Sequence, residues 1–136
     1  MNSSLNLKPV GISDSKFLYE LLMERKLYMN ISHKKMPNYD DHVQFIRSKP
    51  YTKWYIITKN HKKLGSIYLS KQGEIGIFLK KEIQKKGIGV KAMEEIMKLN
   101  PQKRYLANIN PNNKNSICFF KKLGFNLIQY TFEKEN

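Results

Sequence analysis

The stretch from residue 74 to residue 90 constrains the fold of this chain more than any other part of its sequence. Residues 74–79, Glu-Ile-Gly-Ile-Phe-Leu, favour a β-strand. A short polar connection follows, and after Gly87 the apolar residues recur with the period of a helix. The amino terminus of a helix exposes unpaired backbone N–H groups and a partial positive charge, which suit a phosphate. Because glycine has no Cβ atom, Gly87 and Gly89 are expected to let the backbone come close to such a group.

Other interpretations of this turn stay open. Two glycines can simply make a tight connection between a strand and a helix. A Walker loop requires Gly-Lys-Ser/Thr, which does not occur here, and a dinucleotide-binding fingerprint requires a third glycine, which does not follow Gly89. The sequence therefore disfavours nucleotide hydrolysis and dinucleotide binding.

The rest of the chain reads as short strands and helices in one domain that spans residues 1–136, a length that can close one hydrophobic core. We expect strands at 5–10, 53–58, 64–69, 74–79, 105–109 and 125–132, and helices from Asp14 to about Leu27, from Asp40, from Gly87 to Pro101 and at 113–122. This pattern predicts an α+β fold with a mostly antiparallel central sheet, helices on both faces and the order β-α-α-β-β-β-α-β-α-β.

Charge and composition narrow the class of protein. The chain has 25 Lys and Arg against 11 Asp and Glu, a net charge of +14, which favours anionic partners but can also reflect coding bias. Cys118 is the only cysteine, which excludes an intrachain disulfide and fits a reducing compartment. No apolar run has the length of a membrane helix and no signal peptide is found, so we expect a cytoplasmic protein. No residue cluster has metal-ligand spacing, so we expect no metal.

Two motifs resemble those of the GNAT acetyltransferase superfamily. Residues 84–89, Gln-Lys-Lys-Gly-Ile-Gly, fit its pyrophosphate loop, Gln/Arg-x-x-Gly-x-Gly/Ala, placed after the fourth strand. Residues 113–125 resemble its later motif, Asn-x-x-Ala/Ser-x-x-Phe/Leu-Tyr/Phe-x-x-x-Gly-Phe. The resemblance covers nearly the whole chain and implies that acetyl-CoA is the cofactor, that a primary amine is the acceptor, and that free coenzyme A is released.

The resemblance implies a set of cofactor-binding residues. Some belong to the strand that would pair with pantetheine and others to the pyrophosphate loop, the next strand and the later motif: Ile77, Phe78, Leu79, Gln84, Lys85, Lys86, Gly87, Ile88, Gly89, Val90, Asn108, Asn113, Phe119 and Phe120. The later motif also has a purely structural interpretation, in which Asn113 caps a helix, Phe119 and Phe120 are core, and Gly124 ends the helix.

Acetyl transfer to an amine requires a base for the amine and a way to protonate the leaving thiolate. Glu74 is our candidate for the base, since relatives of this kind keep a glutamate at the start of that strand, although it could be an ordinary strand residue. The usual acid is a tyrosine at the position that Phe120 occupies here. We therefore expect Tyr130, or alternatively Ser116 or solvent, to protonate the thiolate. Only one predicted strand follows Gly124, which could leave an edge open or covered by a partner in a homodimer.

The acceptor site of the superfamily lies between its first helices and the sheet. This implies Arg25, His42, Trp54 and Tyr55 as substrate-binding residues, each with a structural alternative in the core or on the surface. The segment from Arg25 to Ile56 loosely resembles enzymes that acetylate amino-sugars carried on nucleoside diphosphates. A protein N-terminal or lysine acetyltransferase is the alternative enzyme, and a basic nucleic-acid-binding module is a distant alternative.

Overall fold

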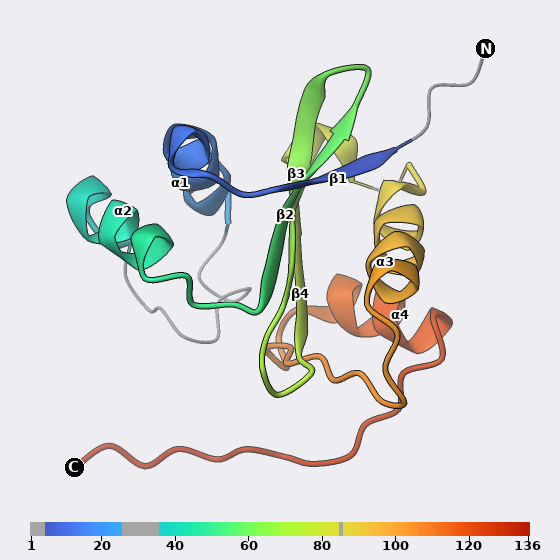
Figure 1. The fold of residues 1–136 in the computed structure, drawn as a ribbon. Helices are drawn as coiled ribbons and strands as arrows, with labels where there is room; N and C mark the ends of the chain where they lie inside the picture. Colours follow the sequence, from blue (N-terminus) through green and yellow to red (C-terminus); the bar gives the residue numbers. More distant parts are fainter. Residues whose placement is uncertain (1–4, 26–35, 85) are drawn as a thin grey trace.

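The computed structural model describes residues 5–25, 36–84 and 86–136 (Figure 1). Its elements in chain order are β1 (Asn6–Pro9), the 3-10 turn η1 (Ile12–Asp14), α1 (Ser15–Met23), α2 (Tyr39–Arg47), β2 (Lys53–Lys59), β3 (Lys62–Leu69), β4 (Ile75–Leu79), the 3-10 turn η3 (Lys81–Ile83), α3 (Ile88–Leu99) and α4 (Lys114–Lys122).

The four strands form one antiparallel sheet in the order β1-β2-β3-β4. Helices α1 and α2 lie on one side of this sheet, and α3 and α4 lie on the other (Figure 1). The predicted α+β class, with an antiparallel sheet between two layers of helices, is confirmed.

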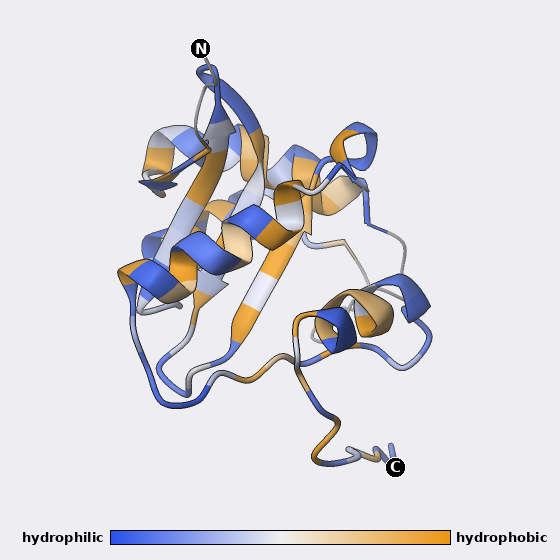
Figure 2. Cartoon of the chain, turned by 90° about the vertical axis from the view of Figure 1, so that its right-hand side faces the viewer, coloured by the Kyte–Doolittle hydropathy of each residue, from blue (hydrophilic) through white to orange (hydrophobic). Residues whose placement is uncertain are grey.

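Each face of the sheet has its own hydrophobic core because side chains alternate along a strand. On β2, Tyr55 and Ile57 belong to the larger core with α3 and α4. Their neighbours Trp54 and Ile56 belong to the smaller core with Leu18 and other residues of the α1/α2 layer. Figure 2 shows the pattern: the helices carry both hydrophilic and hydrophobic residues, while the strands between them are largely hydrophobic.

Two predicted strands do not form as expected. Residues 105–109 make a single parallel bridge, Glu74 with Leu106, and then leave the sheet. Residues 125–132 contain no strand, and the chain runs out as an extended tail (Figure 1). Their β-prone side chains do not suffice, because a strand also needs a neighbouring edge with free backbone groups. The helix predicted to end near Leu27 ends at Met23, and Leu27 itself lies outside the described residues.

Candidate active site

The outer edge of β4 opens one residue after its bridge to Leu106. The Ile75 N–H donates to the Leu106 carbonyl at 2.7 Å, and the Leu106 N–H donates to the Gly73 carbonyl at 2.8 Å. The even-numbered residues of this segment bond to β3 instead: the Ser70 N–H donates to the Glu74 carbonyl and the Lys80 N–H donates to the Leu64 carbonyl, each at 2.9 Å. Backbone groups alternate in direction along a strand, so the odd-numbered residues face the outer edge. The backbone groups of Ile77 therefore face the edge that residues 107–110 have left.

The glycine turn leads from β4 to α3. Gly87 is the N-cap of α3, with φ of +77°, and no side chain caps the helix. The first amides of α3 therefore lack a side-chain cap, which is the state in which a helix N-terminus can bind an anion. Gln84 Nε2 donates to the Leu79 carbonyl at 3.3 Å and ties the turn to the strand. Lys86 is exposed beside the turn, and Lys85 lies outside the described residues.

Gly87 and Gly89 are each required at their positions for a different structural reason. A Cβ atom on Gly87 would meet nothing within 4 Å, so only its left-handed backbone requires glycine. A Cβ atom on Gly89 would lie 3.0 Å from Phe119 Cε1 and 3.1 Å from its Cζ. Gly89 is buried and lets the Phe119 ring pack against α3. The sequence predicts that both glycines allow a close approach to a phosphate, and the structure gives Gly89 this packing role as well.

The later motif builds α4. Asn113 caps the helix, its Oδ1 accepting from the Ser116 N–H at 3.2 Å. Phe120 is buried in the larger core, and its ring contacts Phe119 with a centroid distance of 5.1 Å. Gly124 ends the helix with φ of +94°. The structural roles considered for this motif are therefore present, and Phe119 links α4 to the start of α3.

Glu74 is held in place at the point where the sheet opens. Its Oε1 accepts from the Ser70 hydroxyl at 3.0 Å, and its Oε2 accepts from Asn108 Nδ2 at 2.6 Å. Asn108, predicted to contact the cofactor, here bonds the candidate base. The carboxylate is half-buried and fixed from both sides, which suits a group that must receive a proton in one geometry.

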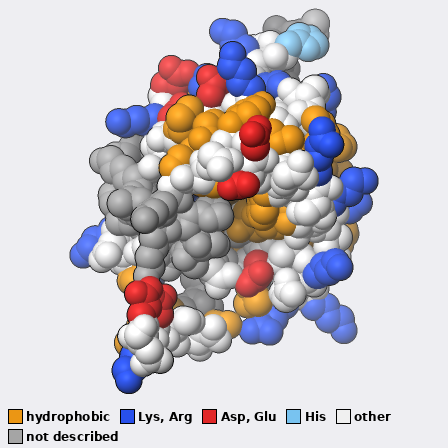
Figure 3. Space-filling model, turned by 90° about the vertical axis from the view of Figure 1, so that its left-hand side faces the viewer, with side chains coloured by type: hydrophobic (Ala, Val, Ile, Leu, Met, Phe, Trp, Pro, Cys, Tyr) orange, Lys and Arg blue, Asp and Glu red, His pale blue; other side chains and the backbone are white. Residues whose placement is uncertain are grey.

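A continuous set of aromatic side chains covers the α1/α2 face of the sheet. It runs through Tyr39, Tyr19, His42, Phe45, Trp54, Tyr51, Tyr68 and Phe78, with ring centroids of neighbours 3.7–6.5 Å apart. Arg25 ends the set, its guanidinium carbon 4.0 Å from the centre of the Phe78 ring. Figure 3 views this side and shows acidic side chains among apolar ones near its middle, with Lys and Arg mostly around its rim.

Burial governs the ionisation of this set. It lowers the pKa of the Arg25 guanidinium to about 10, against the opposing influence of the Tyr68 and Tyr51 hydroxyls. Arg25 therefore stays cationic at neutral pH but is partly dehydrated. Burial also raises the pKa of Tyr51, together with the adjacent Tyr68. Burial and the nearby Glu74 carboxylate raise the pKa of Tyr68, so both tyrosines are neutral at pH 7.

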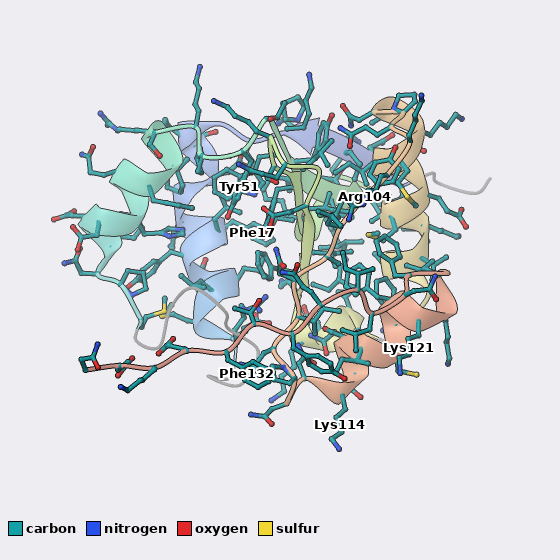
Figure 4. All side chains as sticks on the ribbon, turned by 90° about the horizontal axis from the view of Figure 1, so that it is seen from below. Phe17, Tyr51, Arg104, Lys114, Lys121 and Phe132 are labelled. Atoms are coloured by element: carbon teal, nitrogen blue, oxygen red, sulfur yellow. The ribbon has the colours of Figure 1, made fainter. Side chains whose placement is uncertain are left out.

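Tyr51 and Tyr68 were missed by the sequence analysis. Their rings stack at 3.7 Å with an interplanar angle of 7°, and Tyr68 lies directly opposite Gly76 in the β3–β4 ladder. The available signal was the strand period: Tyr68 faces the same side as Trp54, its partner on β2. In Figure 4, Tyr51 lies on the α1/α2 side of the sheet, whereas Lys114 and Lys121 lie on α4.

The structure does not bring every predicted residue to this face. Tyr55 points into the opposite core, where its hydroxyl accepts from Asn100 Nδ2 at 3.2 Å. Tyr130 is 76 % exposed in the tail, with its ring next to Phe132 rather than Glu74. Trp54 and His42 are on the expected face, packed among aromatic rings. Arg25 lies over the Phe78 ring, on the strand that begins directly after Glu74.

Two kinds of site are missing from the parts of the chain that the structure describes. In residues 5–25, 36–84 and 86–136, no group of His, Cys, Asp or Glu could hold a metal ion. Over those same ranges, no helix has the length and apolar character needed to cross a membrane.

Comparison with known proteins gives one family and many similar folds. Residues 4–126 match the family described as Acetyltransferase (GNAT) domain. No curated protein matches the sequence. A domain from Methanocaldococcus jannaschii is similar with a TM-score of 0.80 and 22% identity, over 97% of this chain and 94% of that chain.

Two further solved structures are named for their activity. A spermidine N-acetyltransferase from Vibrio cholerae, a mutant form, is similar with a TM-score of 0.71 and 14% identity, over 89% of this chain and 78% of that chain. A microcin self-immunity acetyltransferase in complex with acetyl-CoA and AMP is similar with a TM-score of 0.68 and 19% identity, over 91% of this chain and 79% of that chain.

Proposed function

This chain belongs to the GNAT acetyltransferase family and moves an acetyl group from acetyl-CoA to an amine, and from that premise we propose how its residues divide the work. Acetyl-CoA binds with its pyrophosphate at the turn of residues 84–90 and its pantetheine along the open edge of β4. The uncapped amides of α3 and the exposed Lys86 support the first contact. The backbone edge at Ile77 supports the second, since it offers one donor and one acceptor that have no backbone partner among the described residues.

Glu74 acts as the base that takes the proton from the incoming amine. The observation that carries this role is the pair of hydrogen bonds from Ser70 and Asn108, which orient the carboxylate beside the open edge of β4. A carboxylate of ordinary pKa is a weak base for an ammonium ion, so its contribution comes from position, on the order of a hundred- to ten-thousand-fold. Tyr130 lies in the exposed tail, so we assign protonation of the leaving thiolate to water, which a thiol of ordinary pKa allows.

The acceptor is an amine that also carries an anionic group, and Arg25 binds that group. A partly dehydrated guanidinium over an aromatic ring attracts a phosphate or carboxylate and repels a polycation. An amino-sugar linked to a nucleoside diphosphate fits this chemistry, with the aromatic side chains available for stacking. A protein of similar fold was solved in complex with both acetyl-CoA and AMP, so this fold is compatible with binding a nucleotide besides acetyl-CoA. Spermidine, the substrate named for another similar fold, lacks the anion.

A thiol-release assay on three acceptors tests the acceptor class: a nucleotide-linked amino-sugar, spermidine and a peptide with a free amino terminus. We expect turnover of the first. Arg25→Gln should raise its KM at least about tenfold, since a lost charged hydrogen bond costs about 1.5–3 kcal/mol. Arg47→Gln, at the exposed end of α2, is the matched control and should leave KM unchanged. Preferential turnover of the peptide, or equal KM in both variants, contradicts this acceptor class.

The role of Glu74 has its own test. Glu74→Gln keeps the shape of the side chain and removes the base. We expect acetyl-CoA affinity to survive and kcat to fall at least about tenfold, most severely at low pH where free amine is scarce. Equal turnover of the variant and the parent between about pH 6 and pH 9 would mean that Glu74 is structural and that proximity dominates.

A further inference from the structure

The residue that the superfamily resemblance assigns as the usual catalytic tyrosine is Phe120 here, and it is buried in the α3/α4 core. A hydroxyl on the opposite face of the sheet lies near the same opening. Tyr68 lies directly opposite Gly76 of β4. Gly76 comes two residues after Glu74 and directly before Ile77, whose backbone faces the open edge. The tip of the Tyr68 ring lies directly over Gly76.

Gly76 is what allows this placement. A Cβ atom at Gly76 would overlap the Tyr68 ring, lying 2.5 Å from the hydroxyl oxygen. No alanine or larger residue fits there without moving the ring. The tyrosine therefore reaches from β3 across the face of β4 towards the strand edge, rather than standing upright on its own strand.

The surroundings hold the Tyr68 hydroxyl as a donor. Tyr51 stacks against its ring on one side, and Phe78 contacts it with a centroid distance of 6.2 Å. Burial and the Glu74 carboxylate raise its pKa, so it keeps its proton at neutral pH. A hydrogen bond with Tyr51 acts to raise the pKa of Tyr51 and to lower that of Tyr68, the sense expected when the Tyr51 hydroxyl donates and the Tyr68 oxygen accepts, so the Tyr68 proton is left to be donated elsewhere. A fixed, neutral donor beside a reaction centre is the arrangement that stabilises developing negative charge.

We propose that the Tyr68 hydroxyl is a catalytic hydrogen-bond donor to the carbonyl oxygen of the acetyl thioester, in a chain where Phe120 removes the usual tyrosine. As the amine nitrogen forms its bond to the carbonyl carbon, the oxygen gains negative charge and Tyr68 stabilises it without releasing its proton. The carbonyl then reforms, the C–S bond breaks, Glu74 holds the proton from the amine, and the thiolate takes a proton from water. The proposal rests on the thioester lying at the open edge of β4, as proposed above.

Infrared spectroscopy of bound acetyl-CoA, labelled with carbon-13 at its carbonyl, tests this contact without any acceptor. We expect the carbonyl stretch of the label to fall on binding to the parent protein. In Tyr68→Phe, which keeps the stacked ring, the stretch should return most of the way to its value in water. Ser66→Ala is the matched control, because it deletes another hydroxyl from the same face of β3, opposite Phe78. Its stretch should equal that of the parent.

Kinetics provide the second readout. Tyr68→Phe should lower kcat by about a hundredfold while the Kd for acetyl-CoA changes less than about threefold, as when one oxyanion donor is removed. Gly76→Ala moves the Tyr68 hydroxyl without removing it, and the carbonyl stretch in this variant should also return most of the way to its value in water. An unchanged stretch together with an unchanged kcat in Tyr68→Phe overturns the proposal. The infrared measurement uses no acceptor amine, so its result does not depend on the roles proposed for Glu74 and Arg25. Failure of those roles can therefore be distinguished from failure of the role proposed for Tyr68.

Discussion

The turn that begins α3 can be tested by comparing two glycines with the same backbone problem. Gly87 and Gly124 have φ of +77° and +94°, and a Cβ atom on either would meet nothing within 4 Å. An alanine therefore costs each site only the strain of a left-handed backbone, about 1–2 kcal/mol. For a domain of this size, each kcal/mol lowers Tm by about 4 °C, so both variants should melt about 4–8 °C below the parent.

The two variants should differ in cofactor binding. Gly87 is the N-cap of α3, and relief of the strain there turns the first amides away from the pyrophosphate. We expect Gly87→Ala to weaken acetyl-CoA binding at least about tenfold, or about 1.4 kcal/mol. Gly124 lies at the far end of α4, so Gly124→Ala should keep the Kd of the parent. Isothermal titration calorimetry measures both. Equal affinity of Gly87→Ala and Gly124→Ala would refute the placement of the pyrophosphate at this turn.

Three further predictions concern stability. Ser66 is 1 % exposed and its hydroxyl has no hydrogen-bond partner within the described ranges, so Ser66→Ala should stabilise the fold by about 1 kcal/mol in urea denaturation; destabilisation would reveal a hidden partner. Removal of residues 126–136 should change Tm by less than about 2 °C, because this tail forms no strand and Leu127, Ile128, Tyr130 and Phe132 are 62–90 % exposed; a larger loss in calorimetry would mean that the tail packs. Burial opposes ionisation of Asp14, but hydrogen bonds from Lys63 at 2.7 Å and from the Gly11 N–H outweigh it and hold the pKa of Asp14 below its usual value, so Asp14→Asn should cost about 1.5–3 kcal/mol of stability at pH 7. Because a carboxyl group with a lowered pKa stabilises the fold only while it is ionised, this cost should shrink as the pH falls through the pKa of Asp14, and a constant cost from pH 7 to pH 3 would contradict the assignment.

Local features of the fold were predictable from the sequence. The glycine turn, the β2–β3 and β3–β4 hairpins and the four helices depend on residues close together in the chain, so periodicity and turn chemistry suffice. The strands at 105–109 and 125–132 failed for the opposite reason. Each needs a partner edge far away in the sequence, and Leu106 finds only one bridging residue, Glu74. Apolar, β-prone composition alone does not supply that edge.

The residues of the candidate site also differ in whether they depend on nearby or on distant parts of the sequence. Glu74 and Gly87 could be proposed from the sequence because both lie in the continuous strand–turn–helix segment of residues 74–90. Tyr68 could not be proposed in this way, because the role inferred for it depends on the register that places it opposite Gly76. The sequence did contain one unused constraint. Trp54 and Tyr55 are consecutive on a strand and must face opposite sides of the sheet, so they could not both line one acceptor site.

The sheet separates two kinds of recognition, and this explains why one half of the site is easier to predict. On the α3 side, the proposed contacts to acetyl-CoA use backbone amides, which any sequence supplies once a glycine such as Gly87 permits the turn. On the α1/α2 side, the proposed contacts use side chains, namely Arg25, Glu74 and Tyr68, which are far apart in the sequence. A change in acceptor therefore requires only substitutions on that face, whereas the donor site is fixed by chain geometry. Exchange of Arg25 should consequently alter which amine is used without altering the affinity for acetyl-CoA.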